Sequence, residues 1–198
     1  MISMVTAPQS LVLPAWLSDD QLLRQIWRAD QAAFEQLYER YGTDLFSYLV
    51  YLTGDPDVAE ELLQETWLAV WQQAGSFRGE AQVKTWLLRI AHNRAISWRR
   101  RQRPSHCLTE VEAQPAPHNT EEAALRQIED DQLLTLLAYL SPDHRAVIEL
   151  VFFHQLKYEE VAHVLDCPLG TVKSRMAHAR RQLRAHGNFW FGRDSAFE

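Results

Sequence analysis

Large apolar residues recur at steps of three and four along much of the chain, and this spacing most constrains the fold. Between residues 34 and 52, and again between 58 and 71, they lie one helical turn apart. The 198 residues include only seven glycines and eight prolines, so few turns are available, and no convincing strand alternation is present. The sequence therefore predicts an all-α protein.

Capping residues divide this pattern into separate helices. Ser18 followed by DDQ forms a capping box, which predicts a short helix through Trp27. Asp30 can cap the second helix, and the stretch TGDPD ends that helix and starts a third with Asp55 as its cap. After the loop AGSFRGEAQ, a fourth helix is expected over about residues 83–101.

The middle of the chain has a different composition. Residues 104–120 contain three prolines, few large apolar residues and no period, which is typical of a flexible linker. Helical spacing returns over residues 121–140, and Ser141 can cap a further helix that starts at SPDH. The predicted organisation is a helical domain, a linker, a second helical domain and a C-terminal tail, at residues 18–103, 104–120, 121–186 and 187–198.

Charge is strongly segregated along the chain. The formal net charge is −6, yet residues 78–103 hold eight cations and one carboxylate, and residues 167–186 hold five cations and no carboxylate. The segments before and between these two basic stretches are acidic. Two local sites for polyanions fit this distribution better than one uniform binding surface does.

The second basic stretch lies in YEEVAHVLDCPLGTVKSRMAHARRQLR. Two short amphipathic helices joined by the tight turn DCPLG predict a helix-turn-helix, whose second helix enters the DNA major groove. The side chains expected to face outward are Lys173, Ser174, Ala177, His178 and Arg181. Arg175, Arg180 and Arg184 flank this face and are placed to hold phosphates. The alternative is an ordinary solvated face, but five cations without a counter-charge favour nucleic acid.

The first basic stretch combines cations with aromatic residues. Trp86 and Trp98 occur among its arginines and Phe77 directly precedes it. Aromatic side chains stack on single-stranded bases for roughly 1–3 kcal/mol per base. The competing interpretation is that these residues belong to the core. The core is the favoured place for Trp86 because of its helical spacing. For Phe77, which lies in a loop, both interpretations remain open.

Four segments together resemble a known family, the extracytoplasmic-function (ECF) group of bacterial sigma factors. They are AFEQLYERYGTDLFSYLVYLTGDPDVAEELLQETWLAVWQ, FRGEAQVKTWLLRIAHNRAISWRRR, LSPDHRAVIELVFF and YEEVAHVLDCPLGTVKSRMAHARRQL, and they cover most of residues 32–184. The resemblance implies a sigma-2 domain, a linker and a helix-turn-helix sigma-4 domain. It also implies a function, which is to make core RNA polymerase start transcription at particular promoters.

The resemblance also implies where DNA and polymerase bind. The upstream −35 element would be read by Thr171, Lys173, Ser174, Arg175 and His178, with Arg181 beside them. The −10 element would be bound through Phe77, Arg78, Lys84, Asn93, Arg94, Arg99 and Arg100. The polymerase clamp would contact Asp57, Glu61, Gln64 and Glu65, although Asp55 and Asp57 could instead only cap their helix.

The sequence departs from the family in the helix-turn-helix turn. Asp166 stands where the family often has glycine, and aspartate tolerates a left-handed backbone better than most residues. Ala177 and His178 replace bulkier or more basic residues of some members, so the promoter preference is expected to differ.

Two other functional classes compete with this interpretation. An ordinary helix-turn-helix regulator of duplex operators would use residues 157–184 but leave the first basic stretch unexplained. A serine recombinase with Ser97 near Arg94 and Arg99 would need an α/β catalytic domain, for which there is no sign. The spacing of His106, Cys107, His163 and Cys167 fits no usual zinc pattern. No catalytic residue, metal or cofactor is therefore expected.

The expected partners are core RNA polymerase, promoter DNA and an anti-sigma factor, because family members are commonly held by one. No signal peptide or membrane-length apolar run is visible, which predicts a cytoplasmic protein without direct membrane insertion. The two cysteines are expected to be reduced. Because the rest of the chain is acidic, the free protein is expected to bind duplex DNA poorly.

Overall fold

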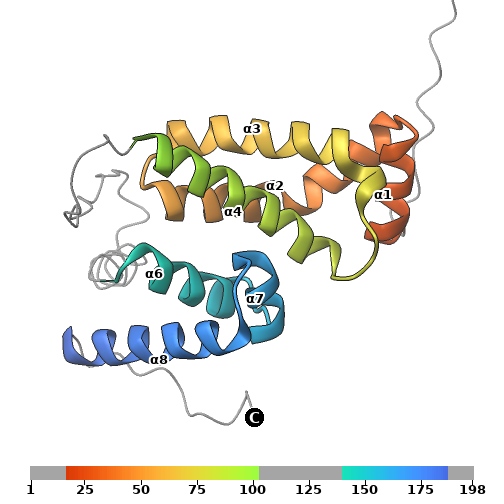
Figure 1. The fold of residues 1–198 in the computed structure, drawn as a ribbon. Helices are drawn as coiled ribbons and strands as arrows, with labels where there is room; N and C mark the ends of the chain where they lie inside the picture. The colour runs from red at the N-terminus through yellow and green to blue at the C-terminus, as the bar shows by residue number, and fades with distance from the viewer. Residues whose placement is uncertain (1–16, 103–139, 187–198) are drawn as a thin grey trace, which may run out of the picture.

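The computed structural model describes residues 17–102 and 140–186, and the regular structure within these ranges is entirely helical, as predicted (Figure 1). The first range holds α1 (Asp19–Trp27), α2 (Gln31–Thr53), α3 (Pro56–Gln73), the 3₁₀ helix η1 (Ala74–Ser76) and α4 (Val83–Gln102). The second holds α6 (Pro142–Ile148), the π-helix η2 (Glu149–Phe153), α7 (Tyr158–Leu165) and α8 (Leu169–His186). The predicted linker, most of the helix expected over 121–140, and the tail lie outside the described residues.

Side-chain caps start α1 and α2 where the sequence predicted them. Ser18 Oγ accepts a hydrogen bond from the Gln21 amide at 3.3 Å, and Gln21 Oε1 accepts one from the Ser18 amide at 2.9 Å. Asp30 Oδ1 accepts from the Ala33 amide at 3.1 Å. These bonds satisfy amides that have no partner within the helix, and so fix where each helix begins.

The turn between α2 and α3 also follows the prediction. Gly54 closes α2 in the left-handed region at φ 73°, and Asp55 Oδ1 accepts from the amides of Asp57 and Val58 at 2.9 and 3.3 Å. Pro56 occupies the first helical position, where its missing N–H costs nothing. The cap of α3 is therefore Asp55, and the side chain of Asp57 is left exposed.

Helices α1 to α4 bury a common apolar core that includes Leu22, Leu37, Leu49, Val70 and Leu87. Aromatic rings fill the space between α2 and α3: Phe34 meets Trp67 and Trp71 edge-on, at centroid distances of 5.5 and 5.4 Å.

In the C-terminal part, α8 buries four apolar residues that recur at helical spacing, which are Val172, Met176, Ala179 and Leu183. On α7, Val161 and Val164 are fully buried, and Tyr158, Ala162 and Leu165 are half-buried against the same core. Asp166 has the left-handed backbone expected of it, with φ 50°. The helix-turn-helix is therefore formed as its sequence predicted.

The π-helix η2 was not predicted. The His154 amide donates to the Glu149 carbonyl five positions earlier, which inserts an extra residue into the turn. This wider turn buries Glu149, Leu150 and Val151 together and leaves Phe153 53% exposed. A helical period of 3.6 residues in the sequence cannot predict the extra residue in this turn.

The two groups of helices contact one another. α4 packs on α7, and α8 lies on the side of α6 and α7 away from α1 to α3 (Figure 1). Buried residues of both groups belong to one hydrophobic cluster. The basic helix α4 therefore presents one side to the N-terminal core and another to the C-terminal helices.

Candidate nucleic-acid and polymerase interfaces

The outward face of α8 carries the polar side chains that the sequence placed there. Lys173, Ser174, Ala177, His178 and Arg181 are all exposed, while the opposite face of the helix is packed. Ser174 Oγ donates to the Thr171 carbonyl at 3.0 Å, so this hydroxyl is engaged by its own helix. Thr171 itself is half-buried in the first turn.

His178 is held between two neighbours. Its ring stacks on His144 of α6 at a centroid distance of 5.7 Å and an interplanar angle of 13°. Arg181 Nη2 lies 2.8 Å from His178 Nδ1, one helical turn along. Desolvation by burial, together with the neighbouring His178, lowers the pKa of His144, so His144 stays neutral near neutral pH. The contacts orient an exposed imidazole beside an arginine on the outward face.

Arg175 points toward the protein rather than outward. Its Nη2 lies 2.5 Å from Asp143 Oδ2 of α6, and its Nη1 lies 3.9 Å from the sulfur of Cys167. The side chain is half-buried and fastens α8 to α6. Among the cations predicted for the −35 element, Lys173 and Arg181 are more exposed than Arg175.

The loop before α4 holds Phe77 against the bundle. Phe77 is half-buried and meets Trp86 of α4 at a centroid distance of 5.5 Å. Trp86 packs on the core, as its spacing predicted. Arg78 is exposed, and Gly79 turns the loop with φ 73°.

A hollow of about 480 Å³, lined by both charged and apolar side chains, lies between α3 and α4. Arg94 and Arg100 line it on α4, and Glu65 faces them from α3, with Arg94 Nη1 3.8 Å from Glu65 Oε2. Ser97 and Arg101 also line the hollow, although neither was predicted for DNA contact. Their distances of three and seven positions from Arg94 would have placed them on the same helix face.

Two further cations predicted for the −10 element are paired with carboxylates. Lys84 Nζ lies 3.3 Å from Asp44 Oδ2 on α2. Arg99 Nη2 lies 4.0 Å from Asp143 Oδ1, which belongs to the C-terminal group. Asn93, by contrast, is exposed.

The residues predicted to contact polymerase share one face of α3. Asp57, Glu61, Gln64 and Glu65 are all exposed and follow one another at helical steps. They form a polar, acidic strip along the outer side of the helix.

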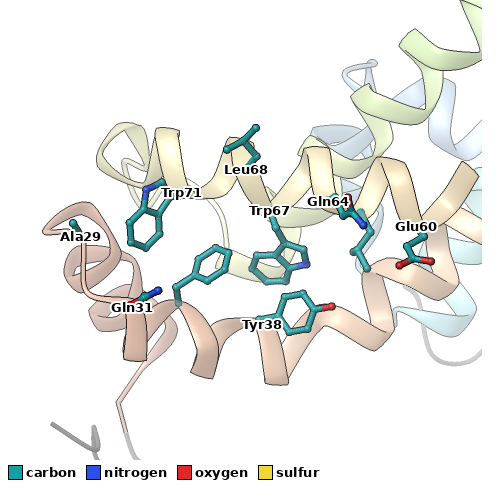
Figure 2. A pocket seen from close by; sticks show the side chains of 10 residues that line it. Ala29, Gln31, Tyr38, Glu60, Gln64, Trp67, Leu68 and Trp71 are labelled. Atoms are coloured by element: carbon teal, nitrogen blue, oxygen red, sulfur yellow. The ribbon is translucent and has the colours of Figure 1, made fainter. Parts of the chain in front are cut away.

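An apolar groove of about 680 Å³ lies beside this strip, between α2 and α3. Figure 2 shows Trp67 and Trp71 from α3 and Tyr38 from α2 lining it, with Gln64 and Glu60 at one end. Leu68 is 57% exposed and Tyr38 is 45% exposed at the groove. Trp67 and Trp71 belong to the apolar spacing of residues 58–71. Spacing within one helix does not indicate a groove, because a groove depends on how two helices are placed.

No group of three or more His, Cys, Asp or Glu residues suited to a metal ion occurs in residues 17–102 and 140–186. In the same ranges, Cys167 is a free thiol.

Across the part of the chain that the structure describes, the helices are too short or too polar to cross a membrane.

Comparison with known families assigns both parts of the chain. The Sigma-70 region 2 model matches residues 37–105, and the Sigma-70, region 4 model matches residues 130–183. The chain is 32% identical over 178 residues to the RNA polymerase sigma-H factor of Pseudomonas aeruginosa, covering 83% of this chain and 91% of that protein. It is also 32% identical over 178 residues to the ECF RNA polymerase sigma-E factor of Escherichia coli K12, covering 84% and 93%.

Solved structures have the same arrangement of helices. CnrH in complex with the cytosolic domain of CnrY aligns with a TM-score of 0.64 at 24% identity, covering 85% of this chain and 96% of that chain. The sigma factor RpoE in complex with the anti-sigma factor NepR from Bartonella quintana aligns with a TM-score of 0.59 at 26% identity, covering 77% and 94%. With two family models, relatives matched over most of their length and a shared fold, the chain belongs to the ECF group of the sigma-70 family, the RNA polymerase sigma factors that direct promoter-specific transcription initiation.

Proposed function

We propose that this chain binds core RNA polymerase through α3 and reads two promoter elements, the −10 element beside α4 and the −35 element with α8. The observation that carries the proposal is the presence of two separate basic surfaces, on α4 and α8, in a chain with an acidic strip on α3. On this proposal residues 18–103 form the sigma-2 domain, 104–120 the linker, 121–186 the sigma-4 domain and 187–198 a tail.

For the −35 element, the exposed face of α8 supports base reading by Lys173, His178 and Arg181, with Thr171 and Ser174 in the first turn. Side chains near the start of a recognition helix meet base edges in the major groove. A guanidinium or ammonium group recognises guanine, and each good bidentate contact discriminates by roughly 1–3 kcal/mol. Arg175 would first have to leave Asp143 to reach a phosphate.

For the −10 element, the hollow lined by Arg94 and Arg100 supports binding of a single strand. The exposed amide of Asn93 offers both a donor and an acceptor to a base. Phe77 and Arg78 lie in the loop that precedes α4, where the ring of Phe77 could stack on a base that has left the DNA duplex. Lys84 and Arg99 would contribute charge once released from Asp44 and Asp143.

For polymerase docking, the acidic strip of Asp57, Glu61, Gln64 and Glu65 supports binding to a basic surface, and the adjacent aromatic groove supplies apolar area. Buried aromatic side chains commonly contribute most of the affinity at protein interfaces, while a polar rim steers association. We therefore extend the docking surface from the four predicted residues to Tyr38, Leu68 and Trp71.

We further propose that an anti-sigma factor holds the chain inactive, which the complex of the sigma factor RpoE with the anti-sigma factor NepR supports. The chain would act in the cytoplasm, where polymerase and promoters are, and would leave the chemistry of RNA synthesis to the polymerase. No metal or cofactor has a role in this proposal.

The test is to mix the chain with sigma-free core polymerase and sequence the transcripts made from a genomic DNA library. Discrete start sites that share paired upstream motifs at fixed spacing are expected. Lys173→Ala should weaken dependence on the upstream motif and Asn93→Ala dependence on the downstream motif, each lowering initiation by about tenfold. Arg24→Gln, an exposed cation on α1, is the control and should change neither.

The competing function is an ordinary helix-turn-helix regulator of duplex operators. It predicts stable, sequence-specific binding by the free chain and no new initiation with core polymerase. That result would overturn the proposal.

A further inference from the structure

Trp27, the last residue of α1, is an aromatic side chain that the core does not use. Its exposed fraction of 69% is the highest among the large apolar side chains of residues 17–102 and 140–186, and the ring lies outside the hydrophobic cluster that joins the helices. A single exposed apolar residue is ordinary on a protein surface and by itself indicates no function. The support behind this ring and the charges beside it set Trp27 apart from such a residue.

The indole ring of Trp27 lies against the backbone of Gly75, the middle residue of η1. A Cβ placed on Gly75 would stand 2.5 Å from Nε1 of the ring and closer still to Cδ1, nearer than nonbonded atoms approach one another. Any other residue at position 75 would therefore displace the indole. The five-membered part of the ring is thus backed by the chain, while most of the side chain faces solvent.

The backbone at the end of α1 is fixed before any partner binds. The amides of Arg28 and Asp30 both donate to the Gln25 carbonyl, at 2.8 and 3.1 Å, and Ala29 between them adopts a left-handed φ of 63°. Asp30 then caps α2. A ligand of Trp27 would therefore not have to order this turn, and ordering is one of the main costs of binding.

Gly75 also places Trp27 beside the loop that we propose binds the −10 element. α1 packs on η1, and Phe77, the first residue of that loop, follows Gly75 by two positions. The ring of Phe77 is held in turn by Trp86 of α4, at a centroid distance of 5.5 Å. Two aromatic side chains, one from the end of α1 and one from the loop, therefore adjoin η1.

Each of these two rings has an exposed arginine directly after it in the sequence. Arg28 follows Trp27, and Arg78 follows Phe77. In the part of the chain that the structure describes, neither arginine forms an ion pair, not even with Glu80 of the same loop. Rings that stack on bases, beside cations that follow phosphates, are the combination that single-stranded nucleic acid requires. This surface therefore suits an anionic strand, whereas the acidic strip on α3 suits a basic partner.

We propose that Trp27 is a second base-stacking platform beside Phe77, and that Arg28 neutralises a phosphate of the same single strand. The unpaired strand bound by the −10 loop would then continue over η1 to the end of α1. Stacking uses the aromatic face that every base presents, so Trp27 would add affinity for the open strand without changing which motif is read. The inference rests on the proposed function, because it concerns the strand that the −10 loop binds.

The competing occupant of this surface is core polymerase. Ala29 and Gln31, close to Trp27 in the sequence, line one end of the aromatic groove proposed for polymerase docking (Figure 2). Trp27 does not itself line that groove. The exposed charge of Arg28 also does not suit the basic partner that the acidic strip favours. Charge and position therefore both favour the DNA strand over polymerase at Trp27.

The first test is a binding titration of the complete complex of the chain and core polymerase with two promoter DNAs. One is a fork whose non-template strand is unpaired from the −10 element toward the start site, and the other is a duplex that carries only the −35 element. Trp27→Ala should weaken binding to the fork by about fivefold or more, because a stacked base is lost, and leave binding to the duplex unchanged. Trp27→Phe should retain most of the affinity, since it keeps an aromatic face.

The matched control is Phe153→Ala, which removes another exposed ring, on η2 in the C-terminal group of helices. Its ratio of affinities for the two DNAs should equal that of the wild type. Equal ratios for Trp27→Ala and Phe153→Ala, with circular dichroism showing both variants folded, would overturn the proposal.

The second test identifies what Trp27 touches. The photoreactive residue p-benzoylphenylalanine in place of Trp27 should crosslink on irradiation to the unpaired strand of the fork within the same complex. Crosslinking to a polymerase subunit and not to DNA would assign Trp27 to the docking surface and overturn the proposal. Normal initiation by the wild type with no effect of Trp27→Ala would refute only the stacking role. A wild type that binds no promoter DNA together with core polymerase would refute the proposed function, and this inference with it.

Discussion

At Gly54 and Asp166 the backbone adopts a left-handed conformation, with φ 73° and 50°, and each residue ends a helix. Glycine accepts this conformation without steric cost, and aspartate accepts it at a smaller cost than most residues. Asp166 is the more informative case, because its side chain also reaches Arg89. A residue that looks like an imperfect turn former thus has a second contact that glycine could not make.

Gly54→Ala should lower the free energy of unfolding by about 1 kcal/mol, because a Cβ is disfavoured at a positive φ even though nothing lies within 4 Å of it. Gly170→Ala is the matched comparison, since it lies in the first turn of α8 with open space around it and without a positive φ. It should raise the free energy of unfolding by about 0.5–1 kcal/mol. Urea denaturation checks both, and equal effects of the two changes would contradict the backbone argument.

At the scale of elements, the structure of α3 distinguishes the aspartate that caps the helix from the aspartate that is free to bind a partner, which the sequence alone did not do. Asp55 accepts two backbone amides and caps the helix, while the side chain of Asp57 is exposed on the face proposed for polymerase. The two aspartates lie two positions apart, so their charges alone do not distinguish them. Their hydrogen bonds do.

Asp55→Ala should lower the free energy of unfolding by about 1 kcal/mol, because two amides lose their acceptor. Asp57→Ala should change stability by less than about 0.5 kcal/mol, as surface substitutions usually do, but should weaken binding to core polymerase. Thermal denaturation and a binding titration with core separate the two effects. A large loss of stability in Asp57→Ala, with unchanged binding, would show that both aspartates only support the helix.

At the scale of the whole molecule, buried titratable groups gather where the two groups of helices meet. Desolvation by burial lowers the pKa of His92 to about 4; Asp143 opposes this shift, whereas Arg99 and Arg175 add to it. Desolvation by burial also lowers the pKa of His154 to about 4, with Lys84 adding to the shift and Asp44 opposing it. Burial raises the pKa of Glu149 to about 8. All three groups are therefore neutral in the folded chain near pH 6.

His154 should make the fold sensitive to acid. The pKa of His154 is lower in the folded chain than the ordinary value of 6.5. Its contribution to the free energy of unfolding is therefore complete above pH 6.5 and is lost as the pH falls toward 4. The loss should reach roughly 2 kcal/mol. Urea denaturation between pH 4 and 7 should show a smaller decline for His154→Gln than for the wild type, and parallel curves would contradict the prediction.

Glu149 should act in the opposite direction. The pKa of Glu149 is raised in the folded chain, so its contribution to the free energy of unfolding is complete below pH 4.5 and is lost as the pH rises through about 8. Relative to the wild type, Glu149→Gln should therefore gain stability between pH 5 and 9, by roughly 2–4 kcal/mol at the alkaline end. Denaturation curves at pH 5 and pH 9 measure this change, which should be absent for the exposed Glu159→Gln control.

Local chemistry in the sequence was enough to predict where α1, α2, α3 and α6 begin, and to predict the helix-turn-helix. Ser18, Asp30, Asp55 and Ser141 cap helices through atoms at most three positions away, so their neighbours in sequence determine the outcome. The apolar stripe of α8 follows from its own spacing in the same way. The resemblance to ECF sigma factors rested on these same segments, and the family models confirm it.

Only the tertiary structure decided which charged side chains are paired and where the hollows lie. Arg89 and Asp166 are 77 positions apart, and Asp143 meets arginines from two helices, because α4 packs on α7 and α8 on α6. The groove between Tyr38 and Trp71 likewise depends on the path of two helices. Periodicity determines which side of a helix is apolar. The partner of a polar side chain, in contrast, depends on how helices far apart in the sequence pack together, and the spacing of residues within one helix carries no information about that packing.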